Sequence, residues 1–182
     1  EIERRSFADR AKHFGDPDFY DIPISELLDS SYLQNRANNI DINIATPSDN
    51  IYAGSWNASE SDETTHFSIV DQYGNASSVT TTLNGSFGSG IVVKNSGFLL
   101  NNEMDDFSIE PGHPNMYGLI GGEANSIIPE KRMLSSMTPT ILEKNGQLFM
   151  IVGTPGGSTI ISAVFQVILN VIEYGMSIEE SV

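Results

Sequence analysis

The clearest pattern in the chain is an alternation of side chains that begins at Thr64. Phe67 and Ile69 share one face of the run Thr64–Val70, and polar residues occupy most of the other face. A period of two is typical of a β-strand. Residues 71–75 predict a turn and residues 76–83 a returning strand. This stretch is therefore expected to form a hairpin that starts directly after a polar segment.

A second hairpin and a helix are expected near the C-terminal end. Strands are predicted over residues 138–143 and 147–152, joined by Asn145-Gly146, a preferred pair for a type I′ turn. A helix is predicted over residues 159–174, ended by Gly175. It is apolar nearly all round, so we expect it to be mostly buried against a sheet.

The N-terminal part predicts helices followed by a long loop. One helix is expected over residues 1–15, with Gly15 as its stop, and a second over residues 26–37, with Ser25 as its N-cap. Residues 45–63 are rich in Ser, Asp, Asn, Gly and Pro and predict a loop. Helices, then paired strands, then a buried helix favour an α+β fold with antiparallel sheets.

Composition excludes several classes of function. Nine Lys and Arg residues against 24 Asp and Glu give a net charge of −15, which argues against nucleic acid and anionic membranes as partners. The absence of cysteine excludes thiolate catalysis, thiolate metal sites and disulfides. Residues 177–180 form a capping box that starts a helix, and the sequence opens in a helical pattern. We therefore expect the sequence to be a piece of a longer protein.

Thr64 is the strongest candidate nucleophile. No Ser-His-Asp arrangement is visible, but a threonine at a chain terminus can use its own α-amine as the base. The Thr64 hydroxyl would attack the carbonyl of Glu63, and hydrolysis of the resulting ester would release a new N-terminal threonine. His66 is expected to be structural, because side-chain alternation points it away from its neighbour Thr65.

Three further groups could bind a substrate, and each has a plainer interpretation. Gly156-Gly157, at a helix start, could hold an oxyanion or form a tight turn. Glu103, Asp105 and Asp106 could grip an amine, hold calcium or be solvated, although their spacing suits calcium poorly. The Ser135-Ser136 pair could donate to a carboxylate or cap a turn. We predict no metal site and no cofactor.

Several of these segments together resemble the γ-glutamyltranspeptidase family of N-terminal-nucleophile hydrolases. The similar segments span nearly the whole chain and are residues 15–19, 64–71, 99–108, 134–137 and 155–158. The resemblance implies a four-layer αββα sandwich, made as a proenzyme that cuts itself between Glu63 and Thr64. Residues 1–63 would then be the C-terminal part of the large subunit. Residues 64–182 would be the N-terminal part of the small, catalytic subunit.

The resemblance also implies a role for each candidate residue. In the catalytic group, Thr64 matches the nucleophile and Thr82 its supporting hydroxyl, while Gly156 and Gly157 match the oxyanion hole. The substrate-binding group consists of Asn84 and Glu103 as substrate contacts, Asp106 for the α-amino group, Ser135 and Ser136 for the α-carboxylate, and Tyr117 as the aromatic of a lid loop (residues 111–122) that reaches Asn84.

Two departures from the family pattern are Met133, where proline is common, and Thr159, where bacterial members often carry arginine. An arginine that binds the substrate α-carboxylate is expected upstream of Glu1.

The expected function is transfer or hydrolysis of γ-glutamyl amides such as glutathione, through a γ-glutamyl ester on Thr64. The expected partners are a γ-glutamyl substrate, an amino-acid, peptide or water acceptor, and the two subunits of one precursor. The family implies a periplasmic or extracellular location. The alternatives are a related acylase, a poly-γ-glutamate enzyme, or an unprocessed module that binds carboxylates without catalysis.

Overall fold

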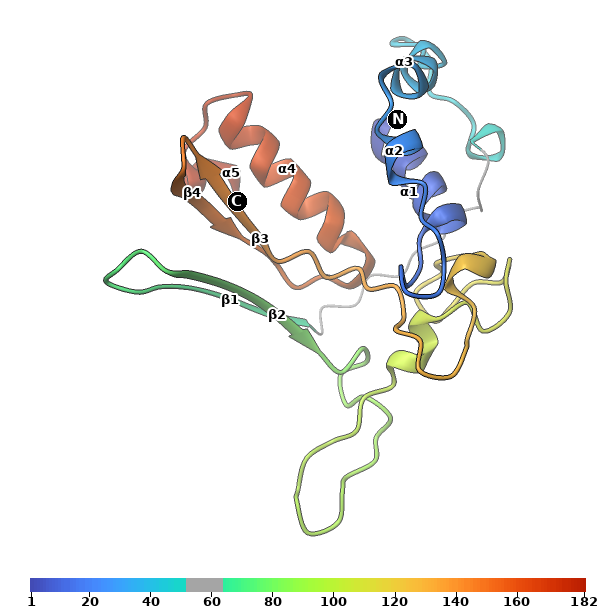
Figure 1. The fold of residues 1–182 in the computed structure, drawn as a ribbon, viewed down its shortest axis with the longest axis vertical. Helices are drawn as coiled ribbons and strands as arrows, with labels where there is room; N and C mark the ends of the chain where they lie inside the picture. Colours follow the sequence, from blue (N-terminus) through green and yellow to red (C-terminus); the bar gives the residue numbers. More distant parts are fainter. Residues whose placement is uncertain (52–63) are drawn as a thin grey trace. The chain divides into compact units, whose positions relative to one another are not determined.

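The computed structural model describes residues 1–51 and 64–182. Tertiary contacts divide these residues into two compact units. Unit 1 comprises residues 1–51 and 104–135, and unit 2 comprises residues 64–103 and 136–182. Helices and antiparallel strands are both present (Figure 1), as expected for an α+β protein.

Unit 1 is built on helices α1 (Ile2–His13), α2 (Ile24–Leu27) and α3 (Ser30–Asn38). The predicted helix over residues 1–15 is confirmed, but its buried face includes Arg5 and Ala8, whereas Ile2 is exposed. Arg5 is accommodated because it bonds to the side chain of Glu1 and donates to the carbonyl of Asn39 at 3.1 Å. Hydrogen bonds therefore allow this charged residue to be buried.

The predicted start of the second helix at Ser25 is wrong. The chain forms the single turn α2 and then starts α3 after Asp29, whose carboxylate accepts from the backbone N–H groups of Ser31 at 2.9 Å and Tyr32 at 3.1 Å. Both Ser25 and Asp29 are good N-cap residue types, and it is Asp29 that satisfies the free N–H groups of the longer helix.

Residues 104–135 complete unit 1 as loops and short 3₁₀ turns, including η3 (Glu123–Asn125). The backbone N–H of Gly122 donates to the carbonyl of Ala11 at 2.9 Å, which fixes this segment to the end of α1. A Cβ atom on Gly15 would lie 2.0 Å from the carbonyl oxygen of Ala124. Glycine is thus required where α1 ends against η3.

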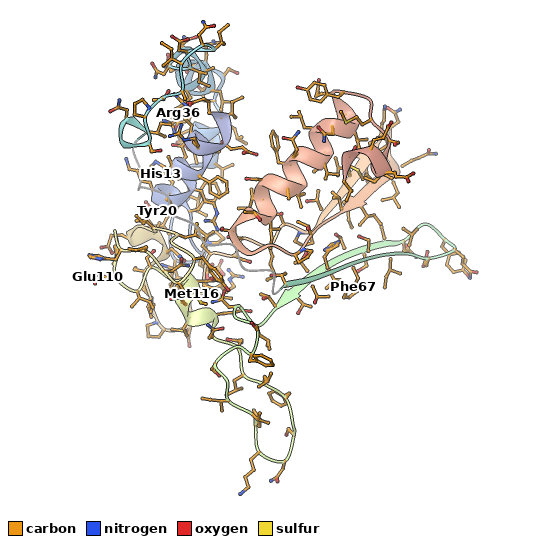
Figure 2. All side chains as sticks on the ribbon, turned by 180° about the vertical axis from the view of Figure 1, so that it is seen from behind. His13, Tyr20, Arg36, Phe67, Glu110 and Met116 are labelled. Atoms are coloured by element: carbon orange, nitrogen blue, oxygen red, sulfur yellow. The ribbon has the colours of Figure 1, made fainter. Side chains whose placement is uncertain are left out.

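Unit 2 contains two antiparallel hairpins. Strand β1 (Thr64–Val70) pairs with β2 (Ala76–Thr82), and β3 (Thr140–Lys144) pairs with β4 (Gln147–Val152). Both predicted hairpins are confirmed. Asn145 and Gly146 have φ angles of 57° and 74°, as a type I′ turn requires. Phe67 and Ile69 share a face of β1 but are exposed, and Figure 2 shows Phe67 on this hairpin.

Helix α4 (Ile160–Ile172) lies along the β3–β4 hairpin (Figure 1) and forms the apolar core of unit 2 with it. Ile160 and Val164 are buried with Val152, and Leu142 and Met150 pack around them. The helix is less buried than predicted, because Phe165 and Ile172 are about half exposed. A two-stranded hairpin covers only one face of a helix, so the other apolar residues face outward in this unit.

The short helix α5 (Ile178–Ser181) follows α4, and it begins with the predicted capping box of Ser177 and Glu180. Among the helices of residues 1–51 and 64–182, none is long and apolar enough to cross a membrane.

Candidate active site

Thr64 and Thr82 face each other at the open end of the first hairpin. They are Cα partners in the β1–β2 ladder. The hydroxyl oxygen of Thr82 accepts a hydrogen bond from the backbone N–H of Asn84 at 3.0 Å. The register of one local hairpin therefore brings together Thr64, Thr82 and Asn84. Glu63, the other side of the predicted cleavage site, lies outside the described residues.

Asn84 is held by contacts with Asn102. Its backbone has a φ of 74°, in the left-handed region that asparagine tolerates better than most residues. Its side-chain amide donates to the carbonyl of Asn102 at 3.3 Å, and only 7% of the residue is exposed. The side chain of Asn102 in turn accepts from the N–H of Gly85 at 2.8 Å. These bonds join the end of β2 to the segment that leads to Glu103.

Gly156 and Gly157 form a tight turn before α4. Their φ angles are 133° and 52°, and Gly157 begins the 3₁₀ turn η4 (Gly157–Thr159). The carbonyl of Gly156 accepts from the N–H of Thr159 at 3.0 Å and from its hydroxyl at 2.7 Å. At the start of a helix, N–H groups lack intrahelical partners and favour negative charge. The tight turn is thus observed, and the oxyanion-hole role of Gly156 and Gly157 stays a prediction.

His66 connects the Thr64 strand to the segment that leads to this turn. Its ring nitrogens lie 2.8 Å from the hydroxyl of Thr80 and 3.0 Å from that of Ser68. A Cβ atom on Gly153 would lie 2.2 Å from the imidazole ring. The imidazole thus packs directly on the backbone just after β4, and these contacts agree with the structural role that alternation predicts.

The three carboxylates at residues 103–106 share one 3₁₀ turn, η2 (Glu103–Asp106), but have different surroundings. Burial raises the pKa of Glu103 above its usual value. Asp105 accepts from the N–H of Met116 at 2.9 Å, and its carbonyl accepts from the side chain of Asn115 at 3.3 Å. Asp105 therefore holds the 111–122 loop. No group of three His, Asp or Glu residues in residues 1–51 and 64–182 is arranged to bind a metal.

Tyr117 is anchored within unit 1. Only 6% of it is exposed, and the side chain of Asn115 accepts from the N–H groups of Tyr117 at 3.0 Å and of Leu119 at 2.9 Å. Met116 and Glu110, from the same part of the chain, are labelled in Figure 2. Because Asn84 belongs to unit 2, the predicted approach of Tyr117 to Asn84 stays a prediction.

Asp106 and Ser135 are joined through a residue that the sequence did not single out. The side-chain amide of Asn125 donates to the carbonyl of Asp106 at 2.7 Å, and its oxygen accepts from the N–H of Leu134 at 3.0 Å. Arg10, from α1, donates to the carbonyl of Ser135 at 3.1 Å. Ser136, the second predicted serine, belongs to unit 2. Neither Asn125 nor Arg10 lies in a recognisable motif, since only the fold brings these segments together.

The comparisons with known proteins agree on a family. The family model described as gamma-glutamyltranspeptidase matches residues 1–182. A glutathione hydrolase proenzyme of Escherichia coli is 51% identical over 181 residues, which cover 100% of this chain and 31% of that protein. The chain thus spans about a third of the length of this curated relative.

Solved structures give the same result. A mutant gamma-glutamyltranspeptidase of Helicobacter pylori is 61% identical, with a TM-score of 0.63 over 65% of this chain and 63% of that one. A cephalosporin acylase of Bacillus halodurans shares the fold, with a TM-score of 0.72 and 24% identity over 97% of this chain and 29% of that one. From its residues, its fold and these matches, the chain belongs to the gamma-glutamyltranspeptidase family.

Proposed function

We propose that this chain carries the nucleophile and part of the substrate site of a γ-glutamyl transferase/hydrolase that acts on glutathione-like amides. One observation carries the proposal: in a member of this family, Thr64 begins β1 directly opposite Thr82. The register supports a role for Thr64 as the nucleophile and for the Thr82 hydroxyl as its support. The E. coli relative named glutathione hydrolase proenzyme supports the substrate class.

The first proposed step is self-cleavage. The Thr64 hydroxyl adds to the Glu63 carbonyl, the C–N bond breaks, and the Thr64 nitrogen takes the hydroxyl proton. Water then hydrolyses the Glu63 ester, which leaves a carboxylate on residues 1–63 and a free α-amine on Thr64. The two products would be the large-subunit and small-subunit parts, and we expect them to build a four-layer αββα sandwich with the rest of the protein.

The second proposed step is catalysis by the new terminus. The Thr64 α-amine accepts the hydroxyl proton while the oxygen attacks the γ-carbonyl of the substrate. N–H groups at Gly156 and Gly157 stabilise the oxyanion, and the proton passes to the leaving amine. Water or an amino-acid or peptide acceptor then takes the γ-glutamyl group from the Thr64 ester.

Recognition is proposed to use both charged groups on the α-carbon of the glutamyl group. Asp106 pairs with the α-ammonium, and Ser135 and Ser136 donate to the α-carboxylate. Asn84 and Glu103 are further proposed contacts, and Tyr117 is the proposed lid aromatic. A periplasmic or extracellular location is also proposed from the family.

The test is made on the full-length protein. After expression, the smaller product should begin with Thr-Thr-His-Phe on N-terminal sequencing, and the mature protein should release p-nitroaniline from γ-glutamyl-p-nitroanilide. Hydrolysis is also measured on cephalosporins with different acyl side chains and on poly-γ-glutamate. A preference for the cephalosporins would favour the acylase alternative, and a preference for the polymer would favour the poly-γ-glutamate enzyme. A stable single chain with full activity, or a different new terminus, would remove Thr64 from its proposed role.

A further inference from the structure

Asn125 bridges the two main-chain segments that carry Asp106 and Ser135. Only 4% of Asn125 is exposed. Its amide donates to the Asp106 carbonyl at 2.7 Å, and its oxygen accepts from the Leu134 N–H at 3.0 Å. The main-chain carbonyl of Asn125 accepts a hydrogen bond from the N–H of Ser108 at 2.9 Å. Because the side-chain amide is planar, these bonds fix both segments relative to one rigid group.

Arg10 acts on the same two segments from helix α1. Its guanidinium donates to the carbonyl of Ser135 at 3.1 Å. Burial lowers the pKa of Arg10 to about 10, and the negative charge of Asp106 opposes that change. Arg10 therefore remains a cation at neutral pH. It holds the Ser135 main chain and attracts the Asp106 carboxylate.

We propose that Arg10 and Asn125 are positioning residues that set the separation of Asp106 and Ser135, and so the selectivity for an α-amino acid end. This inference rests on the proposed function. An α-ammonium and an α-carboxylate are attached to one carbon, so their two binding groups must be held at a fixed spacing. Sites of this kind tolerate errors of only about 0.5 Å. All four residues belong to unit 1.

The position of Arg10 in the sequence implies that it would also link the two products of cleavage. Arg10 precedes the proposed cleavage site, whereas Asp106, Asn125 and Ser135 follow it. After cleavage, Arg10 would therefore belong to the large-subunit part, and its hydrogen bond to the Ser135 carbonyl would join the two products non-covalently. Recognition of the substrate would depend on the association of the two products.

The experiment uses full-length protein and two anilides. γ-Glutamyl-p-nitroanilide carries both α-groups, and glutaryl-p-nitroanilide lacks the ammonium and cannot use Asp106. Arg10→Met and Asn125→Leu should lower kcat/KM for the glutamyl anilide by about tenfold or more, mainly through KM, with a smaller change for the glutaryl anilide. Arg10→Lys keeps the charge and should recover part of the loss.

Arg36→Met is the matched control. Arg36, labelled on α3 in Figure 2, also belongs to unit 1, where it donates to the carbonyl of Arg5 and to Asp9, each at 2.8 Å. Its loss should lower thermal stability but leave the ratio of the two kcat/KM values unchanged. This control separates a general loss of packing from a loss of selectivity.

The outcomes are distinct. If Arg10→Met keeps the wild-type ratio, the two residues are structural only and the inference is wrong. If Asn125→Leu does not fold, the Arg10 pair of variants still decides. If the wild-type enzyme itself does not hydrolyse the glutamyl anilide, the proposed function fails instead.

Discussion

Unit 1 buries charged side chains together with apolar ones, whereas the main core of unit 2, between α4 and the β3–β4 hairpin, is apolar. In unit 1, Asp16, Asn125 and Arg5 are nearly inaccessible and bond to residues in other segments of the chain. In unit 2, Val152, Ile160 and Val164 pack between one hairpin and the helix that follows it. The helix and hairpin of unit 2 are thus held mainly by local pairing and apolar packing, whereas unit 1 adds polar contacts between distant segments to buried apolar residues such as Phe107 and Tyr117.

This difference parallels the proposed division of work. Unit 2 carries Thr64, Thr82 and the Gly156-Gly157 turn, which would make and break bonds. Unit 1 carries Asp106 and Ser135, two of the groups proposed to recognise the amino acid end of the substrate. The ladder of the β1–β2 hairpin fixes Thr64 opposite Thr82, and a buried polar network suits selective binding of two charges. The predictions below separate these two roles.

The largest expected effect is that of Thr64→Ala. Loss of the hydroxyl should block both self-cleavage and turnover of γ-glutamyl-p-nitroanilide, with activity reduced on the order of 10⁴-fold or more. A denaturing gel of the purified full-length variant should show one uncut chain. Thr64→Ser keeps a hydroxyl and is the control that should still be processed. Cleavage in Thr64→Ala would contradict the assignment.

The hairpins of unit 2 could be predicted from the sequence, because their contacts are local. Alternation and turn residues predict both hairpins, and the resemblance pairs Thr82 with Thr64, which the register of the first hairpin places opposite each other. The register shift after Leu142 in the second hairpin has no such signal. The start of α3 was missed because Ser25 and Asp29 are both suitable N-caps. Two helix-starting signals four residues apart cannot be ranked without the tertiary contacts of the helix.

The polar network of unit 1 could not be predicted in the same way. Asn125 matters because it joins Asp106 and Leu134, and no local pattern encodes that meeting. The different roles within the acidic cluster of residues 103–106 could not be predicted either, because the sequence does not reveal that Asp105 accepts from the N–H of Met116. Side chains that bridge distant segments acquire their role only from the fold.

The next effect should be that of Ile160→Ala, which tests the apolar core of unit 2. Ile160 is 1% exposed and directly follows the η4 turn. Its truncation leaves a cavity and should destabilise the protein by about 2–5 kcal/mol, against about 0.5–1.5 kcal/mol for Ile160→Val. Denaturant unfolding of the full-length variants measures both. Equal effects of the two substitutions would mean that the site is not tightly packed.

A comparable effect, on binding rather than folding, is expected for Asp106→Asn. The amide keeps the shape of the side chain but loses the charge that would pair with the substrate ammonium. Transition-state binding should fall by about 2–4 kcal/mol, or ~30–1000-fold in kcat/KM. Self-cleavage involves no substrate ammonium, so processing should remain normal. Wild-type kcat/KM in a correctly processed variant would mean that Asp106 does not bind the ammonium.

The smallest effect should come from Asp16→Asn, which tests the polar network of unit 1. Asp16 accepts from the backbone N–H of Arg132 at 2.8 Å, from its Nε at 3.0 Å and from the N–H of Asp18 at 3.1 Å. The two bonds from Arg132 join residues on either side of the proposed cleavage site. The variant should lower the midpoint of thermal unfolding on the order of 5 °C at pH 7.

The pH dependence of that difference gives the sharper test. The hydrogen bond from the Arg132 side chain, more than any other contact, holds the pKa of Asp16 well below its usual range. A depressed carboxyl pKa stabilises the folded state fully above the unfolded pKa, about 4, and the effect is lost as the pH falls toward the folded pKa. Melting temperatures of the wild type and Asp16→Asn should therefore converge as the pH is lowered below about 4.

The control is Asp18→Asn, since Asp18 pairs with the same arginine but is largely exposed. Its effect should be smaller at every pH because an exposed ion pair contributes little. If Asp18→Asn lowers the melting temperature as much as Asp16→Asn does, burial of the Asp16 carboxylate is not what makes this contact important.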